Sequence, residues 1–474
     1  MVAPADAPAA SEPRTIFEPS LRSTTFGLVT LITMIAFEAM AVGPALPTAA
    51  RDLHGIGAYG WAFTAFLIGN VIGMVASGQH SDVHGPRLPL LAGMGLFVAG
   101  LLVAGSSATM AQLVVARGIQ GLGGGLLITA AYVLIGETYP EALRPKVFAA
   151  TSSAWLVPSL LGPVVSGVLT EHASWRWVFF GLVPFVLGGS LLMMPIVSTL
   201  HRPPVHDRAL GDRRRIVRAV VVGLGVAGIE EAGQHPSPGL IAVGVVGAAA
   251  LAWGIVGLVP SGTFRVAGGV AAPVALRGLL AGAFFGAESL IPLMLSTQHG
   301  YAATASGLPL TGAGVTWALG SWFSGRTVAG DPSVRRARLL RAGFCCVAAA
   351  VALVGVASLP AAPPWLTYPA WLLAGLGAGL AMPTLSVLLL LHTNDRDRGR
   401  DSAALQLSDT TASALTTGLA GILVAAAARA ALGYTAAFVA LDAAMVVLAL
   451  VGAAAAGRTR QTGITDLAAG TSIL

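Results

Sequence analysis

The chain alternates long apolar runs with short polar segments over almost its whole length. Many of the apolar runs extend over about 20 residues, the length that a helix needs to cross about 30 Å of hydrocarbon. The short segments between the runs carry most of the arginine. This pattern predicts an all-α polytopic membrane protein.

Fourteen membrane-spanning helices are predicted from these runs. They cover residues 26–48, 60–79, 89–106, 110–135, 147–170, 176–198, 216–234, 239–260, 277–297, 303–325, 338–358, 365–390, 402–427 and 434–456. An even number of spans places both ends of the chain on the same side of the membrane.

The basic residues give these spans an orientation. With a cytoplasmic N-terminus, 22 of the 27 Lys and Arg residues fall in the tails, in cytoplasmic loops or in the first turn after them. Only Arg51, Arg176 and Arg429 face outside, while Arg117 and Arg277 lie at or inside spans. Because cytoplasmic loops are normally rich in Lys and Arg, we expect both termini to lie in the cytoplasm and the spans to cross the cell inner (cytoplasmic) membrane.

Composition excludes a soluble protein, and missing motifs argue against an enzyme. Only 10 % of the residues are charged, against about 25 % in ordinary globular proteins. The chain has no GxxxxGK[ST] phosphate loop and no HExxH metal motif. The net charge of +6 resides mainly in inside loops. We therefore expect a lipid bilayer as the surroundings, and no ATP, cofactor, metal site or nucleic-acid partner.

An internal repeat relates two parts of the chain. Gly121–Leu126 matches Gly375–Leu380 at an offset of 254 residues, and the same offset pairs Gly167-Val-Leu169 with Gly421-Ile-Leu423. The fourth and fifth spans therefore repeat as the twelfth and thirteenth. Parallel six-helix halves are a known transporter plan, with the substrate bound between the halves.

This repeat predicts two six-helix halves with two helices inserted between them. The expected order is a disordered cytoplasmic tail (1–25), an N-terminal half (26–198), a cytoplasmic loop (199–215), two inserted helices (216–260), a C-terminal half (261–456) and a second cytoplasmic tail (457–474).

The segment after the second span is a candidate cytoplasmic gate. It reads Gly78-Gln-His-Ser-Asp82-Val-His-Gly85-Pro-Arg87. The glycines permit a tight loop, Asp82 can accept hydrogen bonds from a neighbouring helix end, and Arg87 adds an inside charge. An ordinary polar loop explains this segment equally well when it is taken alone.

The fourth span carries a cation and a glycine track on one face. Arg117, Gln120, Gly121, Gly124 and Gly125 share that face because of their helical spacing. An arginine facing lipid is costly, so we expect Arg117 to face protein or a water-filled cavity. The glycines allow another helix to approach closely. The alternative is a structural arginine bound to backbone carbonyls.

These motifs together resemble the major facilitator superfamily, and more narrowly its fourteen-helix drug:proton antiporter family. Members of that family carry an acid in the first span nine residues before a proline, as Glu38 and Pro47 stand here. The other matches are Gly78, Asp82, Gly85 and Arg87 in the gate, Arg117, Gln120 and Gly121 in the fourth span, and Gly162, Pro163 and Gly167 in the antiporter motif of the fifth. The resemblance implies the major facilitator fold and proton-driven export.

Three acids within spans are candidates for carrying the proton, namely Glu38, Glu288 and Asp409. Glu38 lies about 12 residues into its span, roughly 18 Å deep, and Glu288 has a similar depth in the equivalent span of the second half. Burial favours a neutral carboxyl group, whereas a nearby cation such as Arg117 favours the charged form. We expect Arg117 and Gln120 to tune the proton site. A permanent ion pair is the alternative.

A polar stripe follows one face of the thirteenth span. Gln406, Asp409, Thr410, Ser413 and Thr417 make it up, and such a stripe on a membrane helix should face a cavity. We expect Gln406, Thr410 and Ser413 to contact the substrate; hydrogen bonding between helices is the alternative.

The remaining acids in spans receive other interpretations. Asp442 stands alone on an apolar span and is expected to be structural. The pair Glu230-Glu231 lies toward the outer end of the seventh span, where we expect it to touch lipid headgroups or water.

We expect a monomeric proton-coupled antiporter that exports amphipathic or cationic organic compounds by alternating access. The sequence leaves open a lipid or natural-product exporter of the same fold, a proton symporter for uptake, and a non-transporting membrane sensor.

Overall fold

The computed structural model describes residues 15–140, 143–200, 213–325, 332–393, 398–429 and 432–459. All regular structure in these ranges is helical, with seventeen α-helices and four short 3₁₀ helices. The α-helices are α1 Arg22–Asp52, α2 Trp61–His84, α3 Arg87–Gly105, α4 Met110–Thr138, α5 Arg144–Ser153, α6 Leu156–His172, α7 Trp177–Phe180, α8 Val183–Thr199, α9 Arg213–Gln234, α10 Pro238–Val256, α11 Ala271–Glu288, α12 Ile291–Gln298, α13 Ala303–Gly325, α14 Pro332–Ala357, α15 Thr367–His392, α16 Arg398–Ala428 and α17 Tyr434–Ala455. The 3₁₀ helices are η1 Ile56–Ala58, η2 Thr263–Arg265, η3 Pro364–Leu366 and η4 Ala456–Thr459.

These helices form fourteen passes, as the apolar runs predicted. Three passes are broken into two helices each, namely α5 with α6, α7 with α8, and α11 with α12. The sequence predicted each of them as one continuous span, so that expectation was wrong.

Each break precedes a proline in the first turn of the second helix. Pro158 lies in the first turn of α6, Pro184 in that of α8 and Pro292 in that of α12. Proline has no backbone N–H to donate to the preceding turn, and the first turn is the place where a helix tolerates it. The chain therefore restarts its helix at these prolines.

Eleven helical segments among the described residues are long and apolar enough to cross a membrane. The passes outside that set are α5–α6, α9 and α13. Many large apolar side chains are exposed, including Leu191 on α8, Val246 on α10 and Trp322 on α13. A surface of this kind is typical of a protein that lies in lipid, because a soluble protein rarely exposes large apolar patches.

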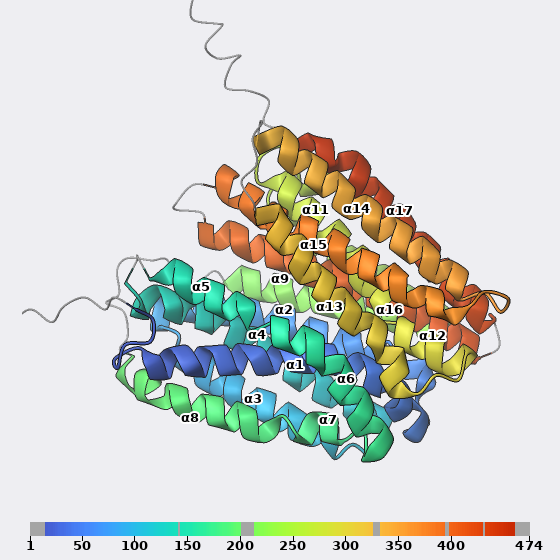
Figure 1. Cartoon of the computed structure of the whole chain (residues 1–474), viewed down its shortest axis with the longest axis horizontal. Coiled ribbons are helices and arrows are strands. Elements are labelled where there is room, and N and C mark those ends of the chain that lie inside the picture. The colour runs from blue at the N-terminus through green and yellow to red at the C-terminus, as the bar shows by residue number, and fades with distance from the viewer. Residues whose placement is uncertain are drawn as a thin grey trace, which may run out of the picture.

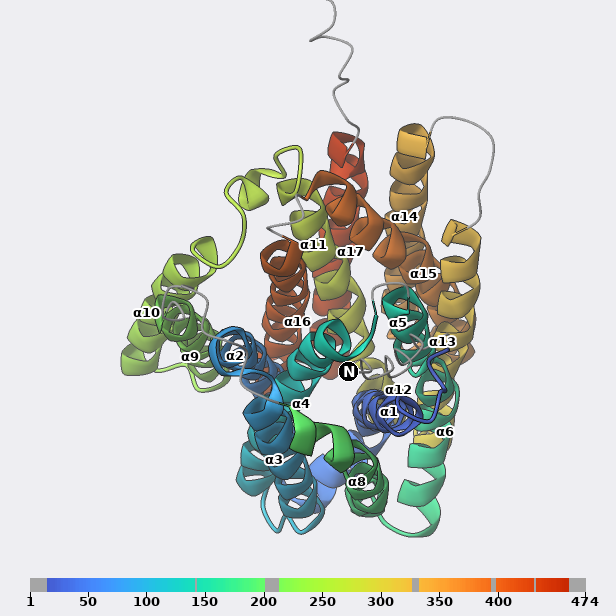
Figure 2. The same cartoon turned by 90° about the vertical axis from the view of Figure 1, so that its left-hand side faces the viewer.

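The helices gather into two groups that meet at one end and separate toward the other. Helices α1 to α8 form the lower group in Figure 1 and helices α11 to α17 form the upper group. Figure 2 shows the same two groups from the end at which they diverge. The pair α9–α10 lies at the side of the molecule, with α9 packed on α2 and α16.

The two groups touch at what we call the closed end. There the hydroxyl of Tyr59 donates a hydrogen bond of 2.9 Å to the carbonyl of Ser289. A Cβ added to Gly60 would lie 2.3 Å from Cα of Gly421, and one added to Gly167 would lie 2.4 Å from Cα of Thr304. Glycine is needed at these positions because the backbones of the two groups touch there.

Glycines also hold one pair of helices together within each group. A Cβ on Gly121 of α4 would lie 1.9 Å from the carbonyl oxygen of Phe66 on α2. At the repeat offset of 254 residues, a Cβ on Gly375 of α15 would lie 2.1 Å from the carbonyl oxygen of Ala313 on α13. The repeat in the sequence thus corresponds to a repeated packing of two helices.

Candidate functional site

Glu38 and Arg117 form a buried ion pair inside the N-terminal group. Glu38 lies near the middle of α1 and Arg117 lies in α4, with 0 % and 2 % of their surfaces exposed. The guanidinium group of Arg117 donates a hydrogen bond through Nη1 to Oε1 of Glu38. The structure therefore brings together two charged side chains that are 79 residues apart.

Three further groups hold the arginine in place. Its Nε donates to the carbonyl oxygen of Ala62 over 3.0 Å, and Nη1 also donates to Oε1 of Gln120 over 3.0 Å. The guanidinium carbon lies 4.4 Å from the ring centre of Phe66, a cation–π contact. Arg117 thus combines the two roles that the sequence left open, since it binds a backbone carbonyl and also pairs with the acid.

Glu38 keeps one oxygen free within the described structure. Its Oε2 is buried without a hydrogen-bond partner there, and the same is true of Nε2 of Gln120. A buried polar atom without a partner costs free energy. A proton on Oε2 would neutralise the carboxylate and weaken its attraction to Arg117.

Glu288 is an acid in the first pass of the C-terminal group and has a different partner; it lies one turn before Pro292, which the repeat offset matches to Glu38. It ends α11, is half-buried and lies against the indole of Trp371 on α15. The repeat offset of 254 residues takes Arg117 to Trp371. Each group therefore places an acid of its first pass against the same position of its fourth pass, which is arginine in one group and tryptophan in the other.

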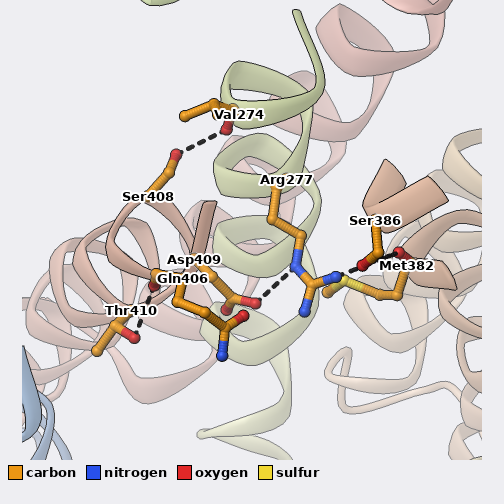
Figure 3. A network of polar contacts seen from close by, with 8 residues as sticks. All are labelled: Val274, Arg277, Met382, Ser386, Gln406, Ser408, Asp409 and Thr410. Atoms are coloured by element: carbon orange, nitrogen blue, oxygen red, sulfur yellow. Dashed lines mark hydrogen bonds and ion pairs between the residues drawn. The ribbon is translucent and has the colours of Figure 1, made fainter. Parts of the chain in front are cut away.

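Asp409 forms a second ion pair, which Figure 3 shows. Its Oδ2 accepts a hydrogen bond of 2.7 Å from Nε of Arg277 on α11, while Nη1 of Arg277 donates to the carbonyl oxygen of Met382 on α15 over 3.2 Å. The two charged side chains are 15 % and 16 % exposed. Arg277 thus joins three helices of the C-terminal group.

The polar stripe on α16 divides into two parts. Gln406, Asp409 and Thr410 are half-buried, and Figure 3 shows Gln406 beside the ion pair of Asp409. Ser413 and Thr417 are each only 3 % exposed. Thr410 donates to the carbonyl of Gln406 in its own helix over 3.0 Å, whereas Oγ of Ser413 has no partner among the described residues.

The residues matched to the antiporter motif, Gly162, Pro163 and Gly167, belong to α6, which packs on α1 and α13. A Cβ on Gly162 would lie 3.0 Å from Cβ of Met40 on α1. A Cβ on Gly307 of α13 would lie 2.7 Å from Cγ of Pro44 and 3.1 Å from the carbonyl oxygen of Pro163. Together with the contact of Gly167 with α13, these glycines allow α6 to seal against the first pass and against the opposite group.

The expected gate residues lie at the end of α2 and the start of α3. Gly78 and Asp82 are part of α2, so the loop predicted over these two residues was wrong. Gly85 ends α2 with φ of +83°, a conformation that suits glycine, and its N–H donates to the carbonyl of Ser81 over 3.0 Å. Gly78 has room for a side chain, with Thr129 at 3.8 Å. Arg87 begins α3 and is exposed. The side chain of Asp82 lies outside the described part of the structure.

Sequence reasoning missed Arg277 as the partner of Asp409, and it was wrong about Glu230. Glu230 is 1 % exposed, so it does not touch headgroups or water. Glu231 beside it is partly exposed, and its Oε1 lies 3.1 Å from Nδ1 of His235. Asp442 is 5 % exposed, and its structural role stays a prediction. The charge of Arg277 inside a span was the available signal; nothing in the sequence showed which helices would cover Glu230.

Comparisons with known proteins agree on one family. The family model described as Major Facilitator Superfamily matches residues 28–417. An uncharacterized MFS-type transporter of Mycobacterium tuberculosis is 30 % identical over 318 residues, which cover 62 % of this chain and 44 % of that protein. Multidrug resistance protein 3 of Bacillus subtilis is 29 % identical over 202 residues, which cover 43 % of this chain and 39 % of that protein. The matches thus span less than half the length of these relatives.

Solved structures show the same fold at low sequence identity. A peptide transporter POT in complex with alafosfalin has a TM-score of 0.65 at 15 % identity, covering 93 % of this chain and 96 % of that one. The human organic anion transporter MFSD10 has a TM-score of 0.60 at 15 % identity, covering 92 % and 98 %. Because the family model covers most of the chain and the helices take up the corresponding arrangement, this chain belongs to the major facilitator superfamily.

Proposed function

We propose that the chain is a proton-coupled antiporter that exports amphipathic or cationic organic compounds across the cytoplasmic membrane by alternating access. The observation that carries this proposal is the buried pair of Glu38 and Arg117, in which one carboxylate oxygen has no partner within the described structure. An ionisable group inside a membrane protein that can gain and lose a proton is what coupling requires.

The state of Glu38 can reach the opposite group through α1. Five residues after Glu38, Gly43 faces Leu310 on α13 and Pro292 on α12, with distances of 3.4 and 3.9 Å from an added Cβ. Pro44 packs on Gly307 of α13. Protonation would loosen α1 from α4 by removing a charge from the ion pair. The same helix would then be free to shift against α12 and α13, which belong to the half that must move.

The ion pair of Asp409 and Arg277 supports a polar substrate site in the other half. Both side chains are partly exposed, and Gln406 lies beside them. A cationic group of a substrate can replace Arg277 at the carboxylate of Asp409, and Gln406 and Thr410 can offer hydrogen bonds. The names of two Bacillus subtilis relatives, a multidrug resistance protein and a multidrug transporter, support organic compounds as the substrate class.

The test is efflux driven by a pH gradient in inverted membrane vesicles that contain the full chain. Wild-type vesicles with an acidic interior should accumulate a fluorescent cationic dye, and a proton uncoupler should abolish the accumulation. Glu38→Gln should lose the pH-driven accumulation because the amide cannot exchange a proton. Glu231→Gln is the matched control, since this acid is exposed on α9.

Accumulation by Glu38→Gln at the wild-type rate would refute Glu38 as the coupling acid. Reversing the pH gradient separates export from uptake, because a proton symporter would accumulate dye in the vesicles when their interior is alkaline rather than acidic. A panel that adds a fluorescent lipid tests the lipid exporter, and transport of no compound in the panel would favour the membrane sensor.

A further inference from the structure

Glu230 is a buried acid at the seam between the two groups of helices, although it belongs to neither. It lies on α9, one of the two helices inserted between the repeats, and is 1 % exposed. Its Oε1 accepts a hydrogen bond of 2.9 Å from Nε2 of Gln234, one turn further along α9. Its Oε2 is buried with no hydrogen bond of normal geometry to any described residue.

The carboxyl group lies where the N-terminal group touches the C-terminal group. A Cβ added to Gly60 would lie 3.2 Å from Oε1 of Glu230, and one added to Gly421 would lie 2.9 Å from the same oxygen. These are the two glycines whose backbones meet at the closed end. Glu230 therefore covers the contact itself, and this contact must part when the closed end opens.

The hydroxyl of Thr64 on α2 lies close to the acid, although neither Oγ1 of Thr64 nor Oε2 of Glu230 makes a hydrogen bond of normal geometry to a described residue. A Cβ added to Gly418 of α16 would lie 3.3 Å from Oε2 of Glu230 and 3.6 Å from Oγ1 of Thr64, so both oxygens lie over the same glycine. Oγ1 of Thr64 is also buried without a partner in the described structure. A hydroxyl group can donate to a carboxylate or accept from a carboxylic acid.

Within the described residues no cation is paired with Glu230. Helix α10 has no titratable side chain. The titratable side chains of α2 and α16 lie in other turns of these helices, away from Glu230. The titratable groups of this region are Glu231 and His235, paired with each other, Tyr59, which donates to Ser289, and Arg429, which donates to the carbonyl of Gln234. A buried carboxylate without a counter-ion is unfavourable, so burial favours the neutral acid.

We propose that Glu230 is a second proton-binding site, which binds a proton as the closed end shuts and releases it as that end opens. In the open form the carboxylate contacts water. When the end closes, the carboxylate takes one proton from that water and becomes the neutral acid. When the end opens, the acid releases this proton to the water on the same side. The proton does not cross the membrane, so this site adjusts the stability of the closed form and adds nothing to the protons transported. The inserted helix α9 thereby senses pH for the two halves.

This proposal rests on the alternating access proposed above, but not on Glu38 as the coupling acid. Its test is the distance across the closed end, measured by pulsed electron paramagnetic resonance between spin labels at Gly57→Cys and Gly433→Cys. An added Cβ at either glycine has no heavy atom within 4 Å. The two natural cysteines, Cys345 and Cys346, are first replaced by serine. The readout needs no substrate, so it remains informative if Glu38→Gln transports normally.

Because protonation of Glu38 is itself proposed to move α1 against the other half, the distances are measured in the Glu38→Gln background, called the parent here. In the parent, acidification should increase the fraction of molecules with the short, closed-end distance. Adding Glu230→Gln should keep the closed fraction high and lose this pH response, because the amide mimics the neutral acid. Adding Glu231→Gln should leave the response of the parent unchanged. Thr64→Val, which retains the acid, should shift the midpoint of the response to higher pH, because the lost hydroxyl stabilised the charged form more than the neutral one.

A pH response that Glu230→Gln leaves unchanged in the Glu38→Gln parent would overturn the proposal, and so would a parent distance that does not change with pH. If Glu230→Gln does not fold, Thr64→Val decides: an unchanged midpoint overturns the proposal and a shift to higher pH supports it.

Discussion

At the scale of single residues, the pair of Glu38 and Arg117 is the most consequential feature of the structure. Both charges are removed from water, and each depends on the other, because an isolated charge in a buried position is very unfavourable. Removing one partner of a buried pair is more costly than removing both. The pair therefore acts as a unit, and under the proposed function its stability depends on whether Glu38 carries a proton.

Arg117→Ala should destabilise the protein by about 3–5 kcal/mol, because it leaves the carboxylate of Glu38 buried and unpaired. The measurement is the thermal unfolding midpoint of the purified protein in detergent. The double variant Glu38→Gln with Arg117→Ala should recover part of the loss, since it leaves no buried charge. A double variant less stable than Arg117→Ala alone would contradict this account.

The second ion pair should show a measurable coupling between its partners. Asp409→Asn and Arg277→Gln each remove the same contact, so their combined effect should be smaller than the sum of the single effects by about 0.5–3 kcal/mol. The four thermal unfolding midpoints give this coupling. Strict additivity would show that the pair contributes nothing in the membrane protein.

Sequence reasoning found the important side chains more readily than their partners. Glu38, Arg117 and Gln120 were grouped correctly, because matched motifs placed them in two spans that pack together. Glu230 was misjudged, because its neighbours come from three helices whose packing no local pattern encodes. A residue near the end of a membrane helix is expected to be exposed to water or headgroups unless other helices cover it.

At the scale of helices, glycine determines which pairs pack most closely. The backbones of α2 and α4 meet at Gly121, and Ala62, whose carbonyl holds Arg117, lies one turn from Phe66 at this contact. A side chain at Gly121 would therefore move a ligand of the arginine as well as the helix.

Gly121→Ala should lower stability by about 1–3 kcal/mol and reduce transport, because its Cβ has no room against the carbonyl of Phe66. Gly136→Ala is the matched control on the same helix, since its Cβ would meet nothing within 4 Å. The comparison uses thermal unfolding and dye efflux of both variants. Equal behaviour of the two variants would contradict the packing shown here.

The helix boundaries were predictable only in part. The apolar runs of the sequence predicted all fourteen passes, including the three that are not among the eleven long apolar segments. They could not show that three passes restart at a proline. A proline within an apolar run is compatible with a kink, a break or a helix start, and the packing of neighbouring helices decides between them.

At the scale of the whole molecule, the structure is shut at one end by contacts between backbones. At these contacts the backbones of the two groups touch directly, with few side chains between them. A single atom added at one of these glycines can therefore shift the balance between the open and closed forms. The number of passes and the repeat followed from the sequence, whereas the position of α9 against both groups did not.

Gly167→Val should hold the closed end apart, because its side chain would occupy the space of Thr304 on α13. The spin-label distance across the closed end should lengthen and dye efflux should fall. Gly239→Ala, at a position with open space around an added Cβ, should leave both unchanged. A closed-end distance in Gly167→Val equal to that of the wild type would refute the role of this contact.

The replacement of Arg117 by Trp371 at the repeated position has a consequence for how the two halves share their work. Two identical copies of the N-terminal half would carry two charge-paired acids and would respond to protons twice in the same way. Here the symmetry of the backbone is kept while the symmetry of the charge is lost. In the N-terminal half the acid of the first pass lies beside a cation, and in the C-terminal half it lies beside an aromatic ring. A protein in which one half replaced the other would therefore not behave in the same way.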